Sequence, residues 1–456
     1  MVQLFETLNA IIWGIPVLLL ILLIGIYLTV RSKFAQIKQL PIAVRSFYRS
    51  FKSTKHSEND TGGYRALCTA LAATVGTGNI AGVAGAIAIG GPGTIFWMWI
   101  CAVLGMITKY AEVTLALKHR YLNSSGEYVG GPMYVIQSAM HPKFRVLAYV
   151  YAFFGVIAAF GIGNATQVNT VIDGIKDIAA VLKHDLCFTD MAIIGGILII
   201  LISYAFQHGG AGVGYWAEKL VPFASLVYIL LCIGALTVCH SQIPHALQII
   251  IKGAFLPQSV TCGIIGSAFL TLRVGASRGV FTNEAGMGTA SIAHASAKVK
   301  DPLEQGRMGM IEVFLDTILI CTLTALVVLC SGVEIPYGTD PGVTLTLDAF
   351  SAVYGDWCRF LITILVCIFA FATMLGWGLY GMRCAQYLFG DKFWRVYVHL
   401  QSTAIILGVI LNTSVVWLLA EIVNGLMAIP NLIMLFICSP EFLRLLNPSQ
   451  KRKRTV

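Results

Sequence analysis

The stretch VGTGNIAGVAGAIAIGGPG, residues 75–93, places a poor helix inside an apolar run of membrane-spanning length. Residues 66–89 are long and apolar enough to cross a bilayer of about 30 Å at about 1.5 Å per residue. Residues 76–79, Gly-Thr-Gly-Asn, interrupt this run with two weak helix formers and two side chains that compete for backbone hydrogen bonds. Because lipid offers no replacement hydrogen bonds, such a break must be buried in protein or line a cavity. We therefore predict a discontinuous membrane helix beside a polar pocket.

A second glycine-rich stretch, VGASRGVFTNEAGMGTA at residues 274–290, interrupts another apolar segment. The two stretches share a pattern, Asn79-Ile-Ala-Gly-Val-Ala and Asn283-Glu-Ala-Gly-Met-Gly, and the two asparagines are 204 residues apart. Paired glycine-interrupted segments in corresponding halves of a chain point to the midplane binding site of a secondary transporter. A chance match of small residues is the alternative, and the position of both stretches inside spans favours a repeat.

The composition is that of a polytopic membrane protein. The 456 residues are 57% hydrophobic and 12% charged, with a mean hydropathy of +0.79, which excludes a soluble globular protein. The apolar tract 11–30 is interpreted as a retained span, because the segment before it carries Glu6 and no Lys or Arg, unlike a signal peptide. The twelve cysteines lack metal-ligand spacing, and the net charge of +9 comes from loops beside spans, so neither a metal nor a nucleic-acid partner is predicted.

Hydropathy, turn residues and charges predict eleven spans. They cover residues 11–30, 66–89, 94–117, 146–171, 190–207, 216–239, 259–293, 306–332, 357–387, 396–413 and 416–438. The loop after the first span is rich in Lys and Arg and is predicted to be cytoplasmic, whereas residues 332–357 contain neither and are predicted to be external. The N-terminus is then outside and the C-terminus inside.

The span count also predicts the domain organisation. Apart from the first span, five spans precede the loop at 240–257 and five follow it. Because five is odd, the second set enters the membrane from the opposite side, which makes the halves inverted repeats. The expected order is an N-terminal span with a basic loop, a first repeat, a second inverted repeat and a basic tail, at residues 1–62, 63–240, 258–440 and 441–456.

Polar residues inside spans are costly, and each suggests a functional role. At Gly76, Thr77, Gly78 and Asn79, free N–H groups at the start of a half-helix would hold a carboxylate, and freed carbonyls would suit Na⁺. The alternative is a glycine-lined helix contact without a ligand.

Three further polar or aromatic positions belong to the same hypothesis. Asn164 and Gln167 stand three residues apart on one predicted helix face, where Gln167 would contact a ligand or another helix. Thr373 and Trp377 stand four apart, so that a hydroxyl would complete a Na⁺ shell and an indole would form the wall of a small pocket. Simple core packing is the alternative for Trp377.

The charges near the second break suggest a gate, in which Arg278 and Glu284 would pair across it. His208 and His294 lack ligand spacing, so no metal site beyond Na⁺ and no cofactor are predicted.

Eight motifs resemble, in order and over nearly the whole chain, the sodium/alanine (alanine or glycine:cation) symporters. They are GTGNIAGVAGAI, GGPGTIFWMW, GMITKYAE, GGPMY, RGVFTNEAGMGTA, DTILICTLTAL, GWGLYG and NGLMAIPNL. The resemblance implies an all-α five-plus-five inverted repeat, as in the leucine transporter and the amino acid/polyamine/organocation superfamily, with an extra N-terminal helix. It also implies the plasma (inner) membrane of a bacterium or archaeon.

The resemblance further implies the residues of the site. By matching positions, the substrate site would be formed by Gly76, Thr77, Asn79, Gln167, Val274, Gly275, Thr373 and Trp377. The cation site would be formed by Thr74, Gly78, Ala370 and Thr373. Val274 is smaller than the aromatic residue often found at this position in relatives, which would widen the pocket or loosen its specificity.

The predicted function is Na⁺-coupled import of small neutral amino acids, alanine or glycine, by alternating access. The partners are the amino acid, Na⁺ and the lipid bilayer. A proton-coupled importer of the same fold, a passive channel and an integral membrane enzyme are the alternatives. An enzyme is disfavoured, because the chain has no H-E-x-x-H, no G-x-S-x-G and no paired intramembrane aspartates at helical spacing.

Overall fold

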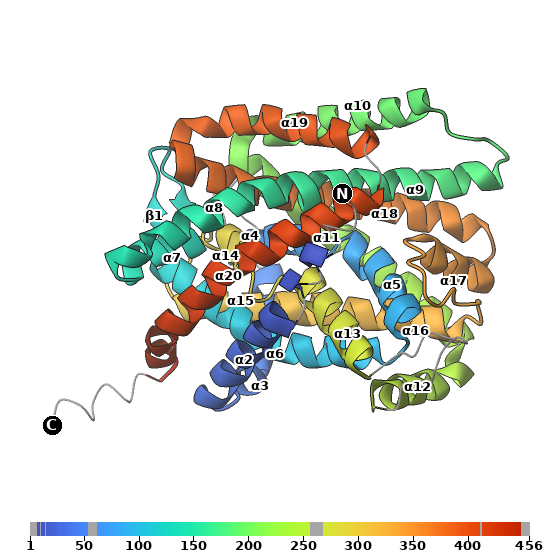
Figure 1. The fold of residues 1–456 in the computed structure, drawn as a ribbon, viewed down its shortest axis with the longest axis horizontal. Helices are drawn as coiled ribbons and strands as arrows, with labels where there is room; N and C mark the ends of the chain where they lie inside the picture. The colour runs from blue at the N-terminus through green and yellow to red at the C-terminus, as the bar shows by residue number, and fades with distance from the viewer. Residues whose placement is uncertain are drawn as a thin grey trace.

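The computed structural model describes residues 7–9, 11–13, 15–52, 62–255, 268–410 and 413–447, without the side chains of 15 and 413–417. Within these residues the protein is helical, apart from a short antiparallel hairpin of β1 (Tyr121–Leu122) and β2 (Tyr128–Val129). Figure 1 shows the long helices packed into one bundle, with α10 and α19 side by side along one edge.

The helices before the middle of the chain are α2 (Ile15–Arg31), α3 (Ala35–Lys52), α4 (Gly63–Thr74), η1 (Thr77–Asn79), α5 (Ala81–Gly90), α6 (Thr94–Lys118), α7 (Pro132–Ala139), η2 (Pro142–Phe144), α8 (Arg145–Phe160), η3 (Gly161–Ala165), α9 (Thr166–Val181), α10 (Phe188–Ala205), η4 (Phe206–His208) and α11 (Gly209–Val238). Those after it are η5 (His240–Gln242), α12 (Ile243–Phe255), α13 (Ala268–Asn283), α14 (Thr289–His294), α15 (Pro302–Val313), η6 (Phe314–Cys321), α16 (Thr322–Cys330), α17 (Thr344–Tyr354), α18 (Trp357–Phe389), η7 (Asp391–Phe393), α19 (Trp394–Ile410) and α20 (Thr413–Leu446).

Among the described residues, seven helical segments are long and apolar enough to cross a membrane, or up to nine if each bent pair counts as one span. The chain is therefore a multi-pass membrane protein. The total of eleven spans, the orientation and the repeat boundaries remain predictions. The basic residues predicted to hold the C-terminal tail inside, Lys451 to Arg454, lie outside the described residues.

The first predicted break is confirmed. The helix α4 ends at Thr74, one turn of 3₁₀ helix follows at Thr77–Asn79, and α5 begins at Ala81. The two halves differ in direction by 58°. The interruption therefore falls on the Gly-Thr-Gly-Asn sequence.

The second break lies farther along the chain than the glycines at 275 and 279 suggest. The helix α13 continues through both glycines to Asn283, and the chain leaves the helical path only between Glu284 and Gly288. Gly275 packs against Thr94 and Trp97 of α6, where a β-carbon would clash. Close packing between two helices explains this glycine, since small residues let membrane helices approach one another.

Two further helical segments each contain a wide π turn. These turns are η3, between α8 and α9, and η6, between α15 and α16. A π turn shifts the helix phase and releases carbonyls, and such turns are common at functional sites. Both lie beside the first break, since η1 contacts η6 and η3 packs against α18, which also contacts η1.

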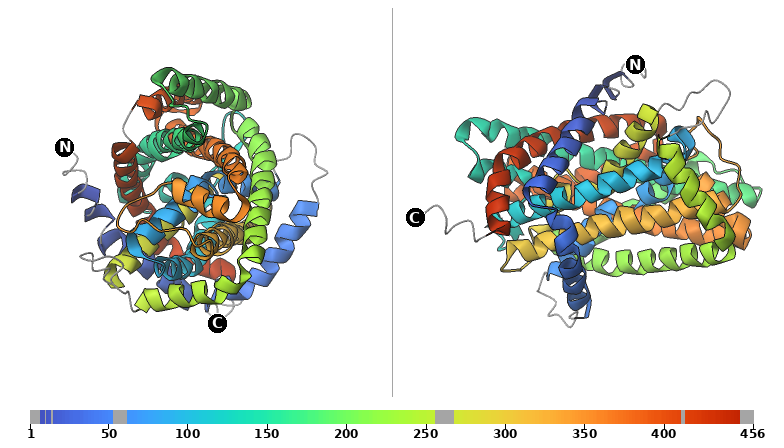
Figure 2. Two further views of the ribbon diagram at one scale, coloured as in Figure 1. Left: turned by 90° about the vertical axis from the view of Figure 1, so that its right-hand side faces the viewer. Right: turned by 90° about the horizontal axis from the view of Figure 1, so that it is seen from below.

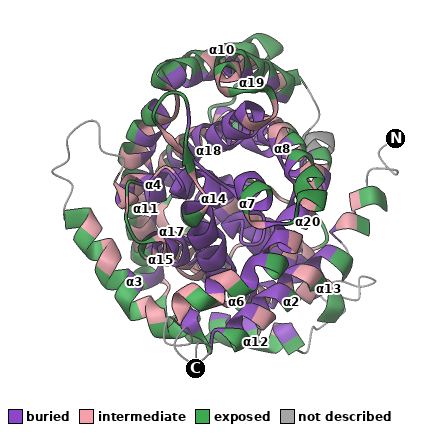
Figure 3. Ribbon diagram, turned by 90° about the vertical axis from the view of Figure 1, so that its left-hand side faces the viewer, coloured by how far each residue is buried: buried purple, intermediate pink, exposed green. Residues whose placement is uncertain are grey.

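Burial divides the bundle into a centre and a rim. Figure 3 shows buried residues concentrated in central helices such as α18 and α14, whereas α10, α19 and α3 carry much exposed surface. The exposed side chains of the rim are largely apolar, including Ile200, Phe223 and Phe153. Exposed apolar helix faces are expected where the solvent is lipid. Figure 2 shows that the α2–α3 pair lies at the outside of the bundle, with a bend of 82° between the two helices.

Candidate binding site at the first helix break

A small cavity lies where the first break meets α8–α9, the end of α13 and α18. It has a volume of about 20 Å³ and is lined by Ala73, Thr74, Gly76, Thr77, Gly78, Ile162, Gln167, Phe281, Thr282, Glu284, Thr373 and Trp377. A cavity of this size holds little more than one water molecule in this conformation. Seven of the residues predicted for the substrate and cation sites are therefore brought together: Thr74, Gly76, Thr77, Gly78, Gln167, Thr373 and Trp377.

Asn79 is held in the wall of the break and does not line the cavity. Its Oδ1 accepts a hydrogen bond of 2.8 Å from the Gly76 N–H, and its Nδ2 donates one of 2.6 Å to Asp316 Oδ1. Both ends of the amide are thus engaged by the protein. The sequence predicted Asn79 as a substrate contact, and the structure gives it the role of holding the unwound segment against η6.

The π turn η3 directs Gln167 toward the first break. Gln167 Nε2 donates to the Ile162 carbonyl at 3.0 Å, and Gln167 Oε1 accepts from Thr77 Oγ1 at 3.0 Å. Asn164, three residues earlier, accepts instead from Gln401 of α19 at 3.3 Å. Both side chains are buried as expected, but they contact different helices, because the wide turn shifts the helix phase between them.

On α18, Thr373 presents a free hydroxyl to the cavity. Thr373 Oγ1 is buried and has no hydrogen-bond partner among the described residues, and a β-carbon at Gly76 would clash with it. A buried hydroxyl without a partner is rare and fits the shell of a cation. Thr74 lines the same cavity, whereas Ala370, one helical turn before Thr373, is fully buried and does not line it.

Trp377 forms an apolar wall of the cavity with Ile162 and Phe281. Its side chain is 1% exposed, and a β-carbon at Gly163 would clash with it. The π turn η3 therefore places Gly163 against Trp377, where a larger residue would not fit.

Val274 and Gly275, which were also predicted for the substrate site, do not line this cavity. Val274 lines a separate cavity together with Arg273 and Ser277, and Gly275 packs against α6. Because the second break lies later in the chain than predicted, Phe281, Thr282 and Glu284 line the cavity instead. These three residues belong to the motif RGVFTNEAGMGTA. A sequence prediction that extended the helix to Asn283 would have placed them at the break.

The predicted gate pair of Arg278 and Glu284 is not formed. Arg278 lies 3.3 Å from Asp340 and 3.7 Å from Glu421 in a larger outer cavity of about 620 Å³. Glu284 accepts a hydrogen bond from Thr289 Oγ1 at 2.5 Å. The two side chains therefore line different cavities.

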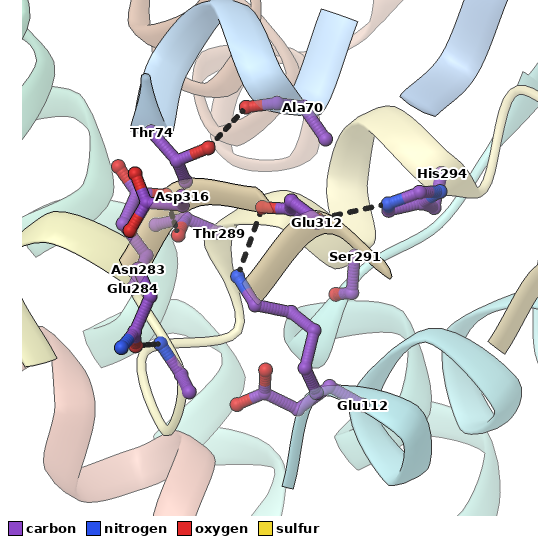
Figure 4. A network of polar contacts seen from close by, with 12 residues as sticks. Ala70, Thr74, Glu112, Asn283, Glu284, Thr289, Ser291, His294, Glu312 and Asp316 are labelled. Carbon is purple, nitrogen blue, oxygen red and sulfur yellow. Dashed lines mark hydrogen bonds and ion pairs between the residues drawn. The ribbon is translucent and has the colours of Figure 1, made fainter. Parts of the chain in front are cut away.

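A buried network of charged side chains lies behind the cavity (Figure 4). Lys109 of α6 forms an ion pair of 3.2 Å with Glu312 of α15, and both are fully buried. His294 of α14 lies 3.0 Å from the other oxygen of Glu312. The network ties the helix after the second break to α6 and α15.

Glu112 closes the second break from α6. Its Oε1 accepts hydrogen bonds from the N–H groups of Gly286 and Gly288, at 3.0 and 3.1 Å, and from Asn431 Nδ2 at 2.7 Å. The free N–H groups of this break are therefore satisfied inside the protein.

Comparison with known proteins shows the family. The family model described as the sodium:alanine symporter family matches residues 1–455. The chain belongs to this family. It is 40% identical over 442 residues to the sodium/alanine symporter AgcS of Methanococcus maripaludis, a match that covers 96% of this chain and 95% of AgcS.

A second relative of the family is the probable sodium/glutamine symporter GlnT of Bacillus subtilis, which is 32% identical over 453 residues, with 98% and 90% of the two chains covered. Among solved structures, MhsT in complex with L-phenylalanine matches with a TM-score of 0.58 at 17% identity, covering 82% of this chain and 89% of MhsT. Its fold is the leucine-transporter fold predicted from the symporter motifs.

Proposed function

We propose that the protein couples the entry of Na⁺ to the import of a small neutral amino acid, alanine or glycine, by alternating access. The observation that carries the proposal is the cavity at the first break. Backbone groups of Gly76–Gly78, an unpartnered hydroxyl and an apolar wall meet there, in a chain of the sodium:alanine symporter family.

The carboxylate of the amino acid is assigned to the N–H groups of Thr77 and Gly78, beside the start of α5, since the Gly76 N–H is already bonded to Asn79. Free N–H groups and the positive end of a half-helix favour an anion. Na⁺ is assigned to the carbonyls of the unwound segment with the hydroxyls of Thr74 and Thr373, because hard cations prefer oxygen ligands. Ala370 would contribute its carbonyl.

The apolar wall explains a preference for small side chains. Trp377 and Phe281 face the cavity, and Trp377 is fixed by its packing on Gly163. The cavity must widen to admit even alanine. The rearrangement that admits the ligand is then part of the transport cycle, since closing and opening around a midplane site define alternating access.

The experiment is uptake into proteoliposomes that contain the purified protein. Labelled alanine should accumulate only under an inward Na⁺ gradient, and counterflow with unlabelled amino acids should rank glycine and alanine above larger ones. Uptake that follows a pH gradient and ignores Na⁺ would establish the proton-coupled alternative. Transport without saturation or counterflow would establish a channel and overturn the proposal.

A further inference from the structure

The second break brings a carboxylate to the cavity. Glu284 lines it together with the unwound residues of the first break, and the side chain is only 2% exposed. Its Oε2 accepts the hydrogen bond from Thr289, and no contact given by the described part of the chain involves Oε1. Since a carboxylate has about four acceptor positions, Glu284 retains hydrogen-bonding capacity next to the cavity.

The other three carboxylates of the buried network each accept hydrogen bonds or an ion pair from the protein. Glu312 pairs with Lys109 and His294. Glu112 Oε1 accepts two backbone N–H groups and an asparagine amide, whereas its Oε2 is buried without a hydrogen-bond partner among the described residues. Asp316 accepts from Asn79 Nδ2 at 2.6 Å and from Thr317 Oγ1 at 2.7 Å. None of the three lines the cavity.

The network has more carboxylates than cations. Within the described residues, the ammonium of Lys109 lies within 4 Å of one carboxylate only, that of Glu312. A buried carboxylate without a cationic partner is costly, and it is retained where a ligand supplies the missing charge. Glu284 is the member of the network that a ligand in the cavity would reach.

The backbone at Glu284 supports a functional reason for the glutamate. Its φ is +55°, in the left-handed region that favours glycine, and the nearby Gly286 and Gly288 have φ values of +93° and +77°. The chain thus keeps a long acidic side chain at a position where glycine would be less strained, and such strain concentrates at functional sites.

We propose that Glu284 is the counter-ion of the substrate's ammonium group. This inference rests on the proposed transport of amino acids and adds the residue that makes the site select an amine. The amino acid then lies with its carboxylate on the first break and its ammonium on Glu284 of the second. The site rejects acids of the same size that lack the amine.

The experiment compares the binding of L-alanine and L-lactate, which carries a hydroxyl in place of the ammonium, to purified protein in saturating Na⁺. Calorimetry is performed on the wild type and on Glu284→Gln. The wild type should bind alanine far more tightly than lactate. In Glu284→Gln, the alanine affinity should fall by about tenfold or more, and the lactate affinity should change by less than about threefold.

The matched control is Glu112→Gln, which removes a carboxylate of the same network that does not line the cavity. It should keep the wild-type ratio of alanine to lactate affinity. If Glu284→Gln does not fold, Glu284→Asp provides the test, because a shorter carboxylate should still prefer alanine to lactate, and loss of that preference would contradict the proposal.

Other outcomes would overturn the assignment. An unchanged ratio in Glu284→Gln would show that the ammonium is bound elsewhere. If the Na⁺ affinity, measured without amino acid, falls and the ratio stays constant, Glu284 belongs to the cation site. Failure of the wild type to bind any amino acid would instead overturn the proposed function.

Discussion

The two helix breaks satisfy their free backbone groups in different ways. At the first break, the Gly76 N–H is capped by Asn79 from the same segment, and the neighbouring residues line the cavity. At the second break, the N–H groups of Gly286 and Gly288 are capped by Glu112 from another helix. The first break therefore keeps backbone groups beside the cavity, whereas the second is closed by the protein.

Asn79 and Asn283, which occupy the same position in the shared sequence pattern, also differ between the two breaks. Asn79 donates to Asp316 and Asn283 donates to Thr317, so the two residues of the shared pattern reach neighbouring positions of η6. Asn79 stands before a half-helix, and Asn283 ends one. The two asparagines of the shared pattern thus make similar contacts, one beside the cavity and the other at a turn that Glu112 caps.

Among changes at the two breaks, removal of the Glu112 carboxylate should reduce the stability of the protein most. Glu112→Ala leaves three buried donors without an acceptor and leaves Lys109 with less compensating charge. We expect a loss of about 3–5 kcal/mol in stability. Thermal unfolding in detergent measures it, with Glu112→Gln as the control that retains an acceptor oxygen. Stability close to wild type in Glu112→Ala would show that the second break does not depend on α6.

Asn79→Ala should be the next most costly change. It removes the acceptor for the Gly76 N–H and one of two donors to the buried Asp316 carboxylate, at a cost of about 2–3 kcal/mol. Because the unwound segment loses its cap, alanine binding should be lost as well. Calorimetric binding and thermal unfolding are measured on the same sample, and wild-type affinity would refute the role given to Asn79.

The corresponding change at the second break, Asn283→Ala, should cost less, about 1–2 kcal/mol, because its partners, Thr317 Oγ1 and the Ala285 N–H, are uncharged. Alanine affinity in the folded protein should stay within about threefold of wild type, since the turn remains capped by Glu112. A loss of binding as large as that of Asn79→Ala would show that the two breaks contribute equally to the site.

Thr373→Val should have the smallest effect on stability without ligand. The hydroxyl has no partner among the described residues, so its replacement by a methyl group should change stability without Na⁺ by less than about 0.5 kcal/mol. Stabilisation by Na⁺ should largely disappear, because the cation loses one oxygen ligand. A Na⁺ titration of the unfolding temperature tests this, and an unchanged response would place the cation elsewhere.

The sequence predicts the first break because residue type alone explains it. Gly76 and Gly78 with Thr77 and Asn79 are poor in helix propensity at a depth where nothing but protein replaces a lost hydrogen bond. Thr373 and Trp377, four residues apart in a regular helix, face the cavity as their spacing predicts.

The second break could not be placed in the same way. Gly275 and Gly279 resemble break residues in sequence, yet they are packing positions on a continuous helix, against Trp97 and Cys101 respectively. The real break depends on Glu112, which is more than 170 residues away and accepts the freed N–H groups. Likewise, Asn164 and Gln167 contact different helices because of the π turn at Gly161–Ala165. A prediction that assumes a regular α-helix of 3.6 residues per turn does not include such a turn.

The amide of Asn79 has a consequence for motion. It joins the unwound segment between α4 and α5 to the Asp316 carboxylate of η6 through two hydrogen bonds between buried groups. Separating them would leave the buried Asp316 carboxylate with one donor fewer, so we expect the first broken helix and η6 to move together in any rearrangement that widens the cavity.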